Sequence, residues 1–275
     1  IMFEKVHQLG TFPTVIPGLS LSRREQGNCE GASIYSTSLA FIVDGQKRSI
    51  IGDKEYVYGK NDCLVVGVDI PATFCTIGST HEHPFLSISV EIDRAVLSEL
   101  IMQLEEIRAL PIRSLQQALC VGEVEVDVWE SVLRLMRLLD RPVDAKILAP
   151  MIIREIYFRV LQSPLGVALR DFNAKQGASA QIAKAIAWLR ENYAAPLSVA
   201  ELADNVHMGV STFHPHFKEV TCMTPLQFHK SLRLHEAKRL MLTQRMDATT
   251  ACYAVGYESP SQFNREYKRQ FGLPP

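Results

Sequence analysis

The sequence predicts an α+β chain of 275 residues: short strands forming a barrel or sandwich, then helices, then an all-α domain with two helix-turn-helix units. Three observations support this prediction. Short apolar runs separated by turn residues fill residues 19–92. The apolar period changes from two to about 3.6 after Asp93. The last third repeats its own pattern at a spacing of fifty residues.

Strands are expected where a short β-rich run is bounded by turn residues. Asp44-Gly45 is a strong hairpin signal between the second and third expected strands, and Gly52-Asp53 provides the next turn. The expected strands are Leu19–Ser22, Leu39–Val43, Lys47–Ile51, Lys54–Tyr58, Asp62–Val68 and Phe85–Ile92.

Asp93 is a typical N-cap and begins the helical part of the N-terminal region. Pro142 begins a later segment that we expect to be interrupted near Pro150 and to continue as Met151–Leu161. Two helices are expected before it, each with one apolar face: Val96, Leu97, Leu100, Ile101 and Leu104, then Val128, Val132, Leu135, Met136 and Leu139.

A chain of this length is expected to hold two domains. Residues 164–166 and 175–180 read as a linker between them. The predicted division is an N-terminal domain at 1–175, with the barrel at about 1–92 and helices at about 93–173, and a C-terminal domain at 178–275.

The repeat in the last third reads twice as a short helix, a tight turn and a second helix that opens with small polar residues. A tandem pair of helix-turn-helix units is typical of a protein that contacts DNA in two places. The matched pairs are Ser211 with Ser261, Phe213 with Phe263, Phe217 with Tyr267, Lys218 with Lys268 and Pro225 with Pro275.

In the first unit, Ser198 and Glu201 have the spacing of a capping box. Gly209 ends the expected turn, either with positive φ or as an N-cap. The second helix is expected at about 210–220, with Phe213 and Phe217 buried on one face.

In the second unit, the first helix is expected at Asp247–Val255. Ser259 as N-cap and Pro260 at the first helical position open its second helix. Phe263 and Tyr267 are expected to point into the core.

A long helix is expected between the units, from Thr224-Pro225 to about Leu242. It would span about 27 Å at 1.5 Å per residue. Adjacent major grooves on one face of B-DNA lie about 34 Å apart, so such a spacer suits two recognition helices in neighbouring grooves.

These segments resemble the DNA-binding domain of AraC-type transcription regulators. The resemblance implies seven helices, with two recognition helices that dock in successive major grooves. It is carried by Ser198–Val206, Phe217–Phe228, Arg233–Met241 and Val255–Pro275.

Mapped residue by residue, the resemblance places DNA-binding side chains on both second helices. Short polar side chains, amides and arginine bond base edges, whereas lysine suits a phosphate. The implied base-reading positions are Ser211, Thr212, His214 and Pro215 in the first unit, and Ser261, Gln262, Asn264 and Arg265 in the second. The basic residues Lys218, Lys268 and Arg269 on the same helices complete the expected DNA-binding set.

Two residues depart from the family pattern. Pro215 stands where the family commonly has arginine or another polar residue, and proline costs about 3 kcal/mol in a helix interior. We expect this helix to kink or to start late, and the second unit to carry more of the sequence specificity. Cys222 stands where glycine is usual, so a left-handed C-cap is expected to be strained there.

The net charge of −1 is unevenly distributed. From Ala178 onward the chain carries an excess of three positive charges (11 Lys/Arg against 8 Asp/Glu), and the preceding part is acidic. We therefore expect few phosphate contacts and an affinity for DNA that falls with salt.

The N-terminal region resembles the cupin-like regulatory domain of one branch of the same family, at Leu39–Gly45, Gly52–Gly59 and Arg141–Tyr157. The resemblance implies ligand sensing in the barrel and dimer contacts from the helices. The implied protein is a sequence-specific regulator, more an activator than a repressor, controlled by an unknown small molecule or by a redox or electrophile signal. Its partners would be double-stranded promoter DNA, RNA polymerase and a second copy.

Three cysteines are candidate redox sensors: Cys29, Cys63 and Cys75. The alternative is that they are small core residues or unreactive surface thiols.

The alternative function is a cupin-type metalloenzyme fused to a DNA-binding domain, because His81-Glu82-His83 contains an H-x-H pair. Glu91 lies farther from His83 than the ligands of those enzymes do, and Pro84 favours a solvated loop. We therefore predict no catalytic residue, no metal site and no cofactor. A third class, a protein-interaction module using the helices at 93–161, leaves the polar recognition faces unexplained.

No apolar run is long enough to cross a membrane, since the run Cys63–Val68 ends at Asp69. No secretory signal pattern is visible, and the six cysteines show no CxxC spacing. We expect a cytoplasmic protein with reduced thiols and no membrane partner.

Overall fold

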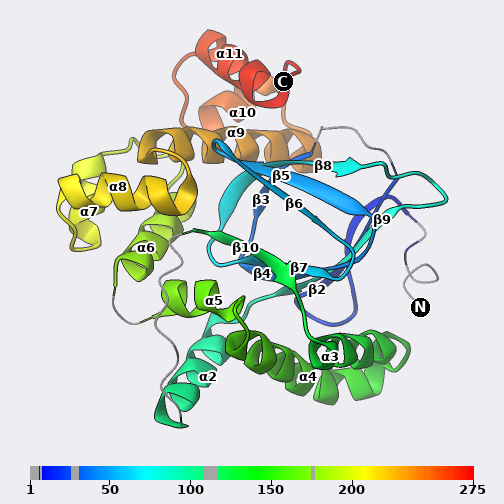
Figure 1. Ribbon diagram of the computed structural model, residues 1–275. Coiled ribbons are helices and arrows are strands. Elements are labelled where there is room, and N and C mark those ends of the chain that lie inside the picture. The colour runs from blue at the N-terminus through cyan, green and yellow to red at the C-terminus, as the bar shows by residue number, and fades with distance from the viewer. Residues whose placement is uncertain (1–5, 7, 26–30, 108–116, 175–176) are drawn as a thin grey trace.

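The computed structural model describes residues 6, 8–25, 31–107, 117–174 and 177–275. Its N-terminal part is built from two antiparallel sheets, followed by helices, and its C-terminal part is helical (Figure 1). The predicted α+β class is confirmed.

The six-stranded sheet has the order β1-β2-β9-β4-β7-β10, and the four-stranded sheet has the order β3-β8-β5-β6. The expected strands did not include β1, β3, β8 or β10. The strands are β1 Gly10–Pro13, β2 Leu19–Arg24, β3 Gly31–Tyr35, β4 Ser38–Asp44, β5 Gln46–Ile51, β6 Lys54–Gly59, β7 Asp62–Val66, β8 Ile70–Ile77, β9 Phe85–Glu91 and β10 Leu119–Glu123.

The hairpin predicted at Asp44-Gly45 is wrong. Strand β4 pairs with β7 and β9, whereas β5 pairs with β6 and β8, so this turn carries the chain from one sheet to the other. Because β4 already has a neighbour on each side, the strand that follows it must leave the sheet. Gly45 makes the corner with φ of 76°, and a Cβ there would lie 2.8 Å from the Cα of Phe85. Gly52-Asp53, by contrast, closes the β5–β6 hairpin.

The helices of the N-terminal part are α2 Arg94–Ile107, α3 Val126–Arg137, a 3₁₀ turn Leu138–Asp140, α4 Pro142–Gln162 and α5 Gly166–Asn173. Asp93 caps α2 as predicted, since its Oδ1 accepts bonds from the N–H groups of Ala95 and Val96 at 2.8 and 3.1 Å. Tyr157 fixes α4 to the sheet, because its hydroxyl donates to the carbonyl of Glu91 at 2.6 Å.

The interruption predicted near Pro150 is wrong, because α4 runs unbroken through it. Proline removes the hydrogen bond to the carbonyl four residues back, which is that of Lys146. Both residues are exposed, so water can satisfy that carbonyl. The expected linker at 164–166 is also shorter than predicted, since α5 begins at Gly166. Residues 175–176 lie outside the described residues.

The C-terminal part consists, over the described residues 177–275, of six helices rather than the seven that the resemblance implies. They are α6 Ala178–Glu191, α7 Val199–Asn205, α8 Val210–Thr221, α9 Pro225–Gln244, α10 Ala248–Ala254 and α11 Pro260–Phe271. No helix in the described part of the chain is both long and apolar enough to span a membrane.

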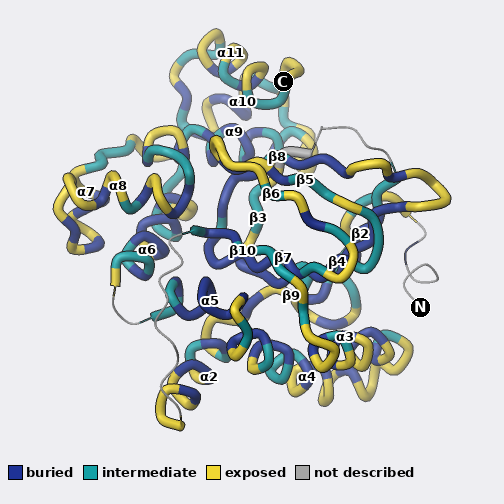
Figure 2. The backbone as a smooth tube through the Cα atoms, in the orientation of Figure 1, coloured by how far each residue is buried: buried dark blue, intermediate teal, exposed yellow. Residues whose placement is uncertain are grey.

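Two clusters of buried apolar residues hold the chain together. The buried stretches of the backbone are dark blue in Figure 2. The larger cluster extends from the barrel through α2–α5 into the first helix-turn-helix unit and ends at Leu232 in α9. The smaller cluster begins at Leu234 and contains the second unit. Arg233 lies between them and ties α9 to the loop after α6, donating to the carbonyls of Tyr193, Ala194 and Ala195 at 2.7–3.0 Å.

The buried His235 of α9 makes stability depend on pH. Its ring lies edge-on to Phe271, with centroids 5.3 Å apart, and its Nε2 has no hydrogen-bond partner among the described residues. Burial first, and the charge on Lys238 second, lower the pKa of His235 to about 4. An unfolded histidine titrates near about 6.5, so only the unfolded state takes up this proton between pH 6.5 and about 4. The contribution of neutral His235 to the free energy of unfolding is therefore fully present above pH 6.5 and is lost as the pH falls toward about 4.

We predict that His235→Leu removes this dependence. Between pH 7 and 4.5, the free energy of unfolding of the variant should fall less steeply than that of the parent chain, by up to about one bound proton. Urea denaturation at several pH values measures both slopes. His214→Leu, which changes an exposed histidine, should keep the parent slope. Equal slopes for His235→Leu and the parent would refute the assignment.

Candidate DNA interface and effector cavity

The first recognition helix, α8, is held by aromatic packing on one face. Phe213 and Phe217 are fully buried with ring centroids 5.4 Å apart, and Phe217 lies edge-on to Phe228 of α9 at 5.4 Å. The opposite face is exposed and carries the predicted DNA-binding residues of this unit, Ser211, Thr212, His214 and Lys218.

Of the two roles expected for Gly209 in the turn of the first unit, that of N-cap is confirmed. Gly209 caps α8 in an extended conformation, and His207 is the residue with positive φ (57°). Of the expected capping box, the described structure contains the bond from the Glu201 N–H to Ser198 Oγ, at 3.3 Å.

The predicted late start of α8 at Pro215 is wrong, since the helix runs from Val210 to Thr221 with Pro215 inside it. Pro215 and Ser211, whose carbonyl loses its helical partner, are both exposed, so solvent replaces that bond. The expected left-handed C-cap at Cys222 is confirmed, with φ of 57° and its N–H donating to the Lys218 carbonyl at 2.7 Å.

The second recognition helix, α11, repeats the same arrangement. Ser259 caps it, accepting from the Gln262 N–H at 3.4 Å, and Phe263 and Tyr267 are buried. Ser261, Gln262, Asn264, Arg265, Lys268 and Arg269 are all exposed. Both sets of predicted DNA-binding residues therefore lie on the exposed faces of α8 and α11.

Helix α9 sets the separation of the two units. Its N-terminus is closed by a complete capping box between Thr224 and Gln227, with Pro225 at the first position. Its 20 residues correspond to about 30 Å of helix, close to the distance between successive major grooves.

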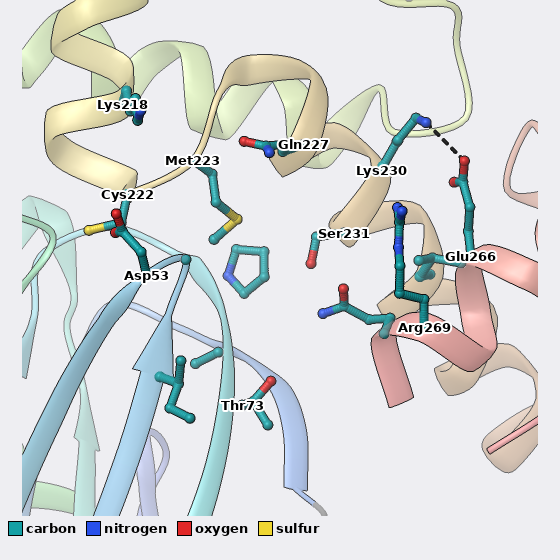
Figure 3. A pocket seen from close by; sticks show the side chains of 16 residues that line it. Asp53, Thr73, Lys218, Cys222, Met223, Gln227, Lys230, Ser231, Glu266 and Arg269 are labelled. Atoms are coloured by element: carbon teal, nitrogen blue, oxygen red, sulfur yellow. Dashed lines mark hydrogen bonds and ion pairs between the residues drawn. The ribbon is translucent and has the colours of Figure 1, made fainter. Parts of the chain in front are cut away.

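A cleft of about 630 Å³ lies between the barrel and the DNA-binding units (Figure 3). Its walls include Lys218 of α8 and Arg269 of α11 on one side, and Asp53 and Thr73 of the barrel on the other. Lys230 of α9 joins α9 to α11, since its ammonium group donates to Glu266 of α11 at 2.9 Å. The cleft thus contains two residues that the sequence assigned to DNA.

Beside the cleft, the barrel contacts the helices directly. The Ala118 N–H donates to the carbonyl of Val220 in α8 at 3.0 Å. Asp69, in the loop between β7 and β8, forms an ion pair with Arg190 of α6. Gly52 lies so close to α8 that a Cβ on it would be 2.1 Å from the Cys222 carbonyl oxygen. Helix α9 packs on β3 and β8.

A second cavity, of about 370 Å³, lies within the barrel between the two sheets. Its described lining includes Arg24, Tyr35, Lys47, Phe74 and Phe85, together with several serines and aliphatic residues. Burial first, and the charge on Arg24 second, lower the pKa of Lys47 to about 7.

The H-x-H pair lies in a loop, and the described candidate cysteines Cys63 and Cys75 lie in β7 and β8. His81 and His83 lie exposed in the loop between β8 and β9, as predicted, and His81 Nδ1 contacts Glu25 at 3.0 Å. The described residues contain no group of three potential metal ligands. Cys63 is fully buried, and burial raises its pKa; Cys75 Sγ accepts from Arg48 Nε at 3.3 Å. Cys29 lies outside the described residues.

Comparison with known families agrees with this architecture. Residues 15–168 match the family model of the AraC-type transcriptional regulator N-terminus, and residues 202–275 match a helix-turn-helix domain model. The chain belongs to the AraC-type transcriptional regulators. The family is described as one of transcriptional regulators.

Among curated relatives of this AraC-type chain are the HTH-type transcriptional activators RhaS. That of Escherichia fergusonii is 30% identical over 125 residues, 44% of each chain. That of Salmonella schwarzengrund is 27% identical over 155 residues, 55% of this chain and 54% of the relative. These matches span about half of the relatives' length or less.

Among solved structures, ToxT from Vibrio cholerae has the same fold. An apo variant of ToxT superposes with a TM-score of 0.62 and 11% identity, covering 94% of this chain and 95% of ToxT. ToxT with an unsaturated fatty acid bound gives a TM-score of 0.58 at 11% identity, covering 94% and 92%.

We predict that Arg265 and Lys268 contribute to DNA binding in different ways. With an operator selected from random DNA by this AraC-type chain, Arg265→Ala should cost about 1–3 kcal/mol and relax the base preference at one position. Lys268→Ala should weaken operator and random duplex alike and reduce the salt slope by about one. Fluorescence anisotropy over a salt series measures both.

Lys60→Ala, which changes an exposed lysine between β6 and β7, is the matched control and should bind like the parent chain. The assignment fails if Arg265→Ala keeps the parent base preference, or if Lys268→Ala keeps the parent salt slope.

Proposed function

We propose that this chain is a sequence-specific transcription regulator, acting as an activator, whose DNA binding is controlled by a small molecule held in a cupin-like barrel. The observation that carries this proposal is the cleft in which Lys218 and Arg269, one from each recognition helix, face the barrel. Both cations line this cleft, so a phosphate bound to either of them would lie close to the barrel. The position of the barrel and the binding of DNA are therefore coupled.

A chain of contacts links the barrel cavity to the DNA-binding units. Ser36 and Ser38 line the cavity on either side of Thr37. Asp69 accepts from the Thr37 N–H and hydroxyl at 2.6 and 3.0 Å, and also pairs with Arg190 of α6. A ligand that moves the segment 36–38 thus acts on the same carboxylate that holds α6.

The remaining parts of the proposal rest on resemblance. The relatives named above are transcriptional activators, which supports activation and contact with RNA polymerase. The proposed division is 1–175 and 178–275, in a cytoplasmic protein. Cys63 and Cys75 are both buried, which favours a small-molecule signal over a redox signal, and Cys29 remains a candidate sensor.

Helix α4 supports the proposal of a homodimer. Large apolar side chains repeat every four residues along its exposed side, and such a patch on a soluble monomer is usually covered by a partner. Val143 is 79% exposed, Ile147 70% and Met151 64%. We propose that α4 packs on α4 of a second copy.

For control by the barrel, we predict that Asp69→Asn and Arg190→Gln each raise operator affinity in the absence of effector, because each weakens the contact that holds the barrel over Lys218. The effects should not add in the double variant, since both remove one ion pair. Asp144→Asn, which changes an exposed carboxylate of α4, should have no effect. Additive effects, or unchanged operator affinity, would contradict the coupling.

For the homodimer, we predict that Ile147→Glu yields monomers, because it places a charge in the centre of the apolar contact. Sedimentation of the purified chain measures the assembly state. Lys146→Glu, at the neighbouring position on α4, changes the net charge of the chain more than Ile147→Glu does, but it should leave the dimer intact. A monomeric parent chain, or a dimeric Ile147→Glu variant, would show that α4 is not the interface.

A further inference from the structure

The barrel cavity contains two positive charges and no described negative charge. Arg24 from β2 and Lys47 from β5 are the two cations, and none of its described lining residues is Asp or Glu. The other described lining residues carry hydroxyl or apolar side chains. Both cations are half-buried, and a cation that is partly removed from water is more stable beside an anionic partner, because desolvating an isolated charge is costly.

The surroundings of Lys47 show the excess of positive charge in the cavity. Its Nζ lies 4.0 Å from the ring centroid of Phe74, 5.0 Å from that of Tyr35 and 5.7 Å from that of Phe85. In the described part of the chain no oxygen accepts a hydrogen bond from it. The aromatic faces compensate only part of the charge, since a cation–π contact contributes about 0.5–2 kcal/mol.

Arg24 shares this environment. Its guanidinium carbon lies 4.8 Å from the ring centroid of Phe74, the same ring that Lys47 contacts, and its one hydrogen bond to a described residue is a long one to Thr11 Oγ1 at 3.4 Å. Two cations that share a ring, without a described anion between them, are chemically suited to an anionic group. A planar carboxylate can accept two bonds from an arginine and one from a lysine.

We propose that the barrel cavity binds a small organic carboxylate, with its carboxylate held between Arg24 and Lys47 and its body against the serines and aliphatic residues of the wall. The cavity, at about 370 Å³, is at the small end of the range for ligand sites, so the ligand is small. This inference rests on the proposed function in one respect, which is that the bound carboxylate is taken as the effector that controls DNA binding.

The site also predicts how affinity varies with pH. The titratable groups that face Lys47 are Arg24 of β2, Tyr35 of β3 and Tyr58 of β6, and burial raises the pKa of both tyrosines, which stay neutral. Lys47 with its pKa of about 7 is half neutral at that pH, and an anion beside it favours the protonated form. Binding therefore takes up a proton above pH 7, and affinity falls by up to about tenfold per pH unit there.

The test is calorimetric titration of the full chain with octanoate, benzoate and citrate, with octanamide and benzamide as neutral matches, and with inorganic phosphate as a separate arm. We expect at least one carboxylate to bind at least about tenfold more tightly than its amide. Lys47→Met and Arg24→Gln should each remove this preference, and Lys60→Met should retain it. Without ligand, Lys47→Met should melt at a higher temperature than the parent chain, because the uncompensated ammonium is gone.

The inference is overturned if no carboxylate binds, if acids and amides bind equally, if phosphate binds more tightly than every carboxylate, or if both cavity variants keep the parent preference. Operator affinity, measured in parallel, separates this result from the proposed function. If no carboxylate binds, operator affinity should still be unchanged, so this inference can fail while DNA binding stands. A bound carboxylate that leaves operator affinity unchanged supports the site but overturns its role as effector.

Discussion

Burial of one aromatic pair on each recognition helix is the constraint on which the DNA-binding region depends. Phe213 and Phe217 in α8, and Phe263 and Tyr267 in α11, occupy positions four residues apart and so share one face of a helix. Once that face is buried, the polar positions between them must face solvent. The same constraint acts in both units because the aromatic pair is repeated, and α9 fixes the distance between the two exposed polar faces.

The barrel is not an independent attachment to these units. The larger buried cluster contains barrel residues together with Phe213, Phe217 and Phe228, whereas the second unit has a cluster of its own. Packed cores change between discrete arrangements rather than deforming continuously. A rearrangement of the barrel therefore acts on α8 through the contacts of Val220 and Cys222, and on α9 through its packing on β3 and β8.

Local signals in the sequence predicted the elements, and long-range packing decided what the sequence could not show. The cap at Asp93, the helix start at Ser259-Pro260 and the aromatic repeat are local features, and each was confirmed. Asp44-Gly45 was misread because a turn signal does not say whether the next strand pairs with the last one. The interruption at Pro150 and the late start at Pro215 were misread because exposure of the freed carbonyl, which lets a helix continue through proline, depends on tertiary context. The cavity was invisible for the same reason, since Arg24 and Lys47 come together only when β2 and β5 face each other in different sheets.

The two units are therefore suited to different tasks. The first unit shares its core with the barrel, carries the left-handed Cys222 next to Gly52, and has Pro215, which cannot bond a base, at the centre of its exposed face. The second unit has a separate core and exposes Gln262, Asn264 and Arg265, which can read base edges bidentately. A unit whose position changes with the state of the barrel is a poor place for most of the specificity, because its base contacts would be remade in each state. We infer that α11 supplies most of the sequence recognition, and that α8 supplies the contacts that ligand binding strengthens or withdraws.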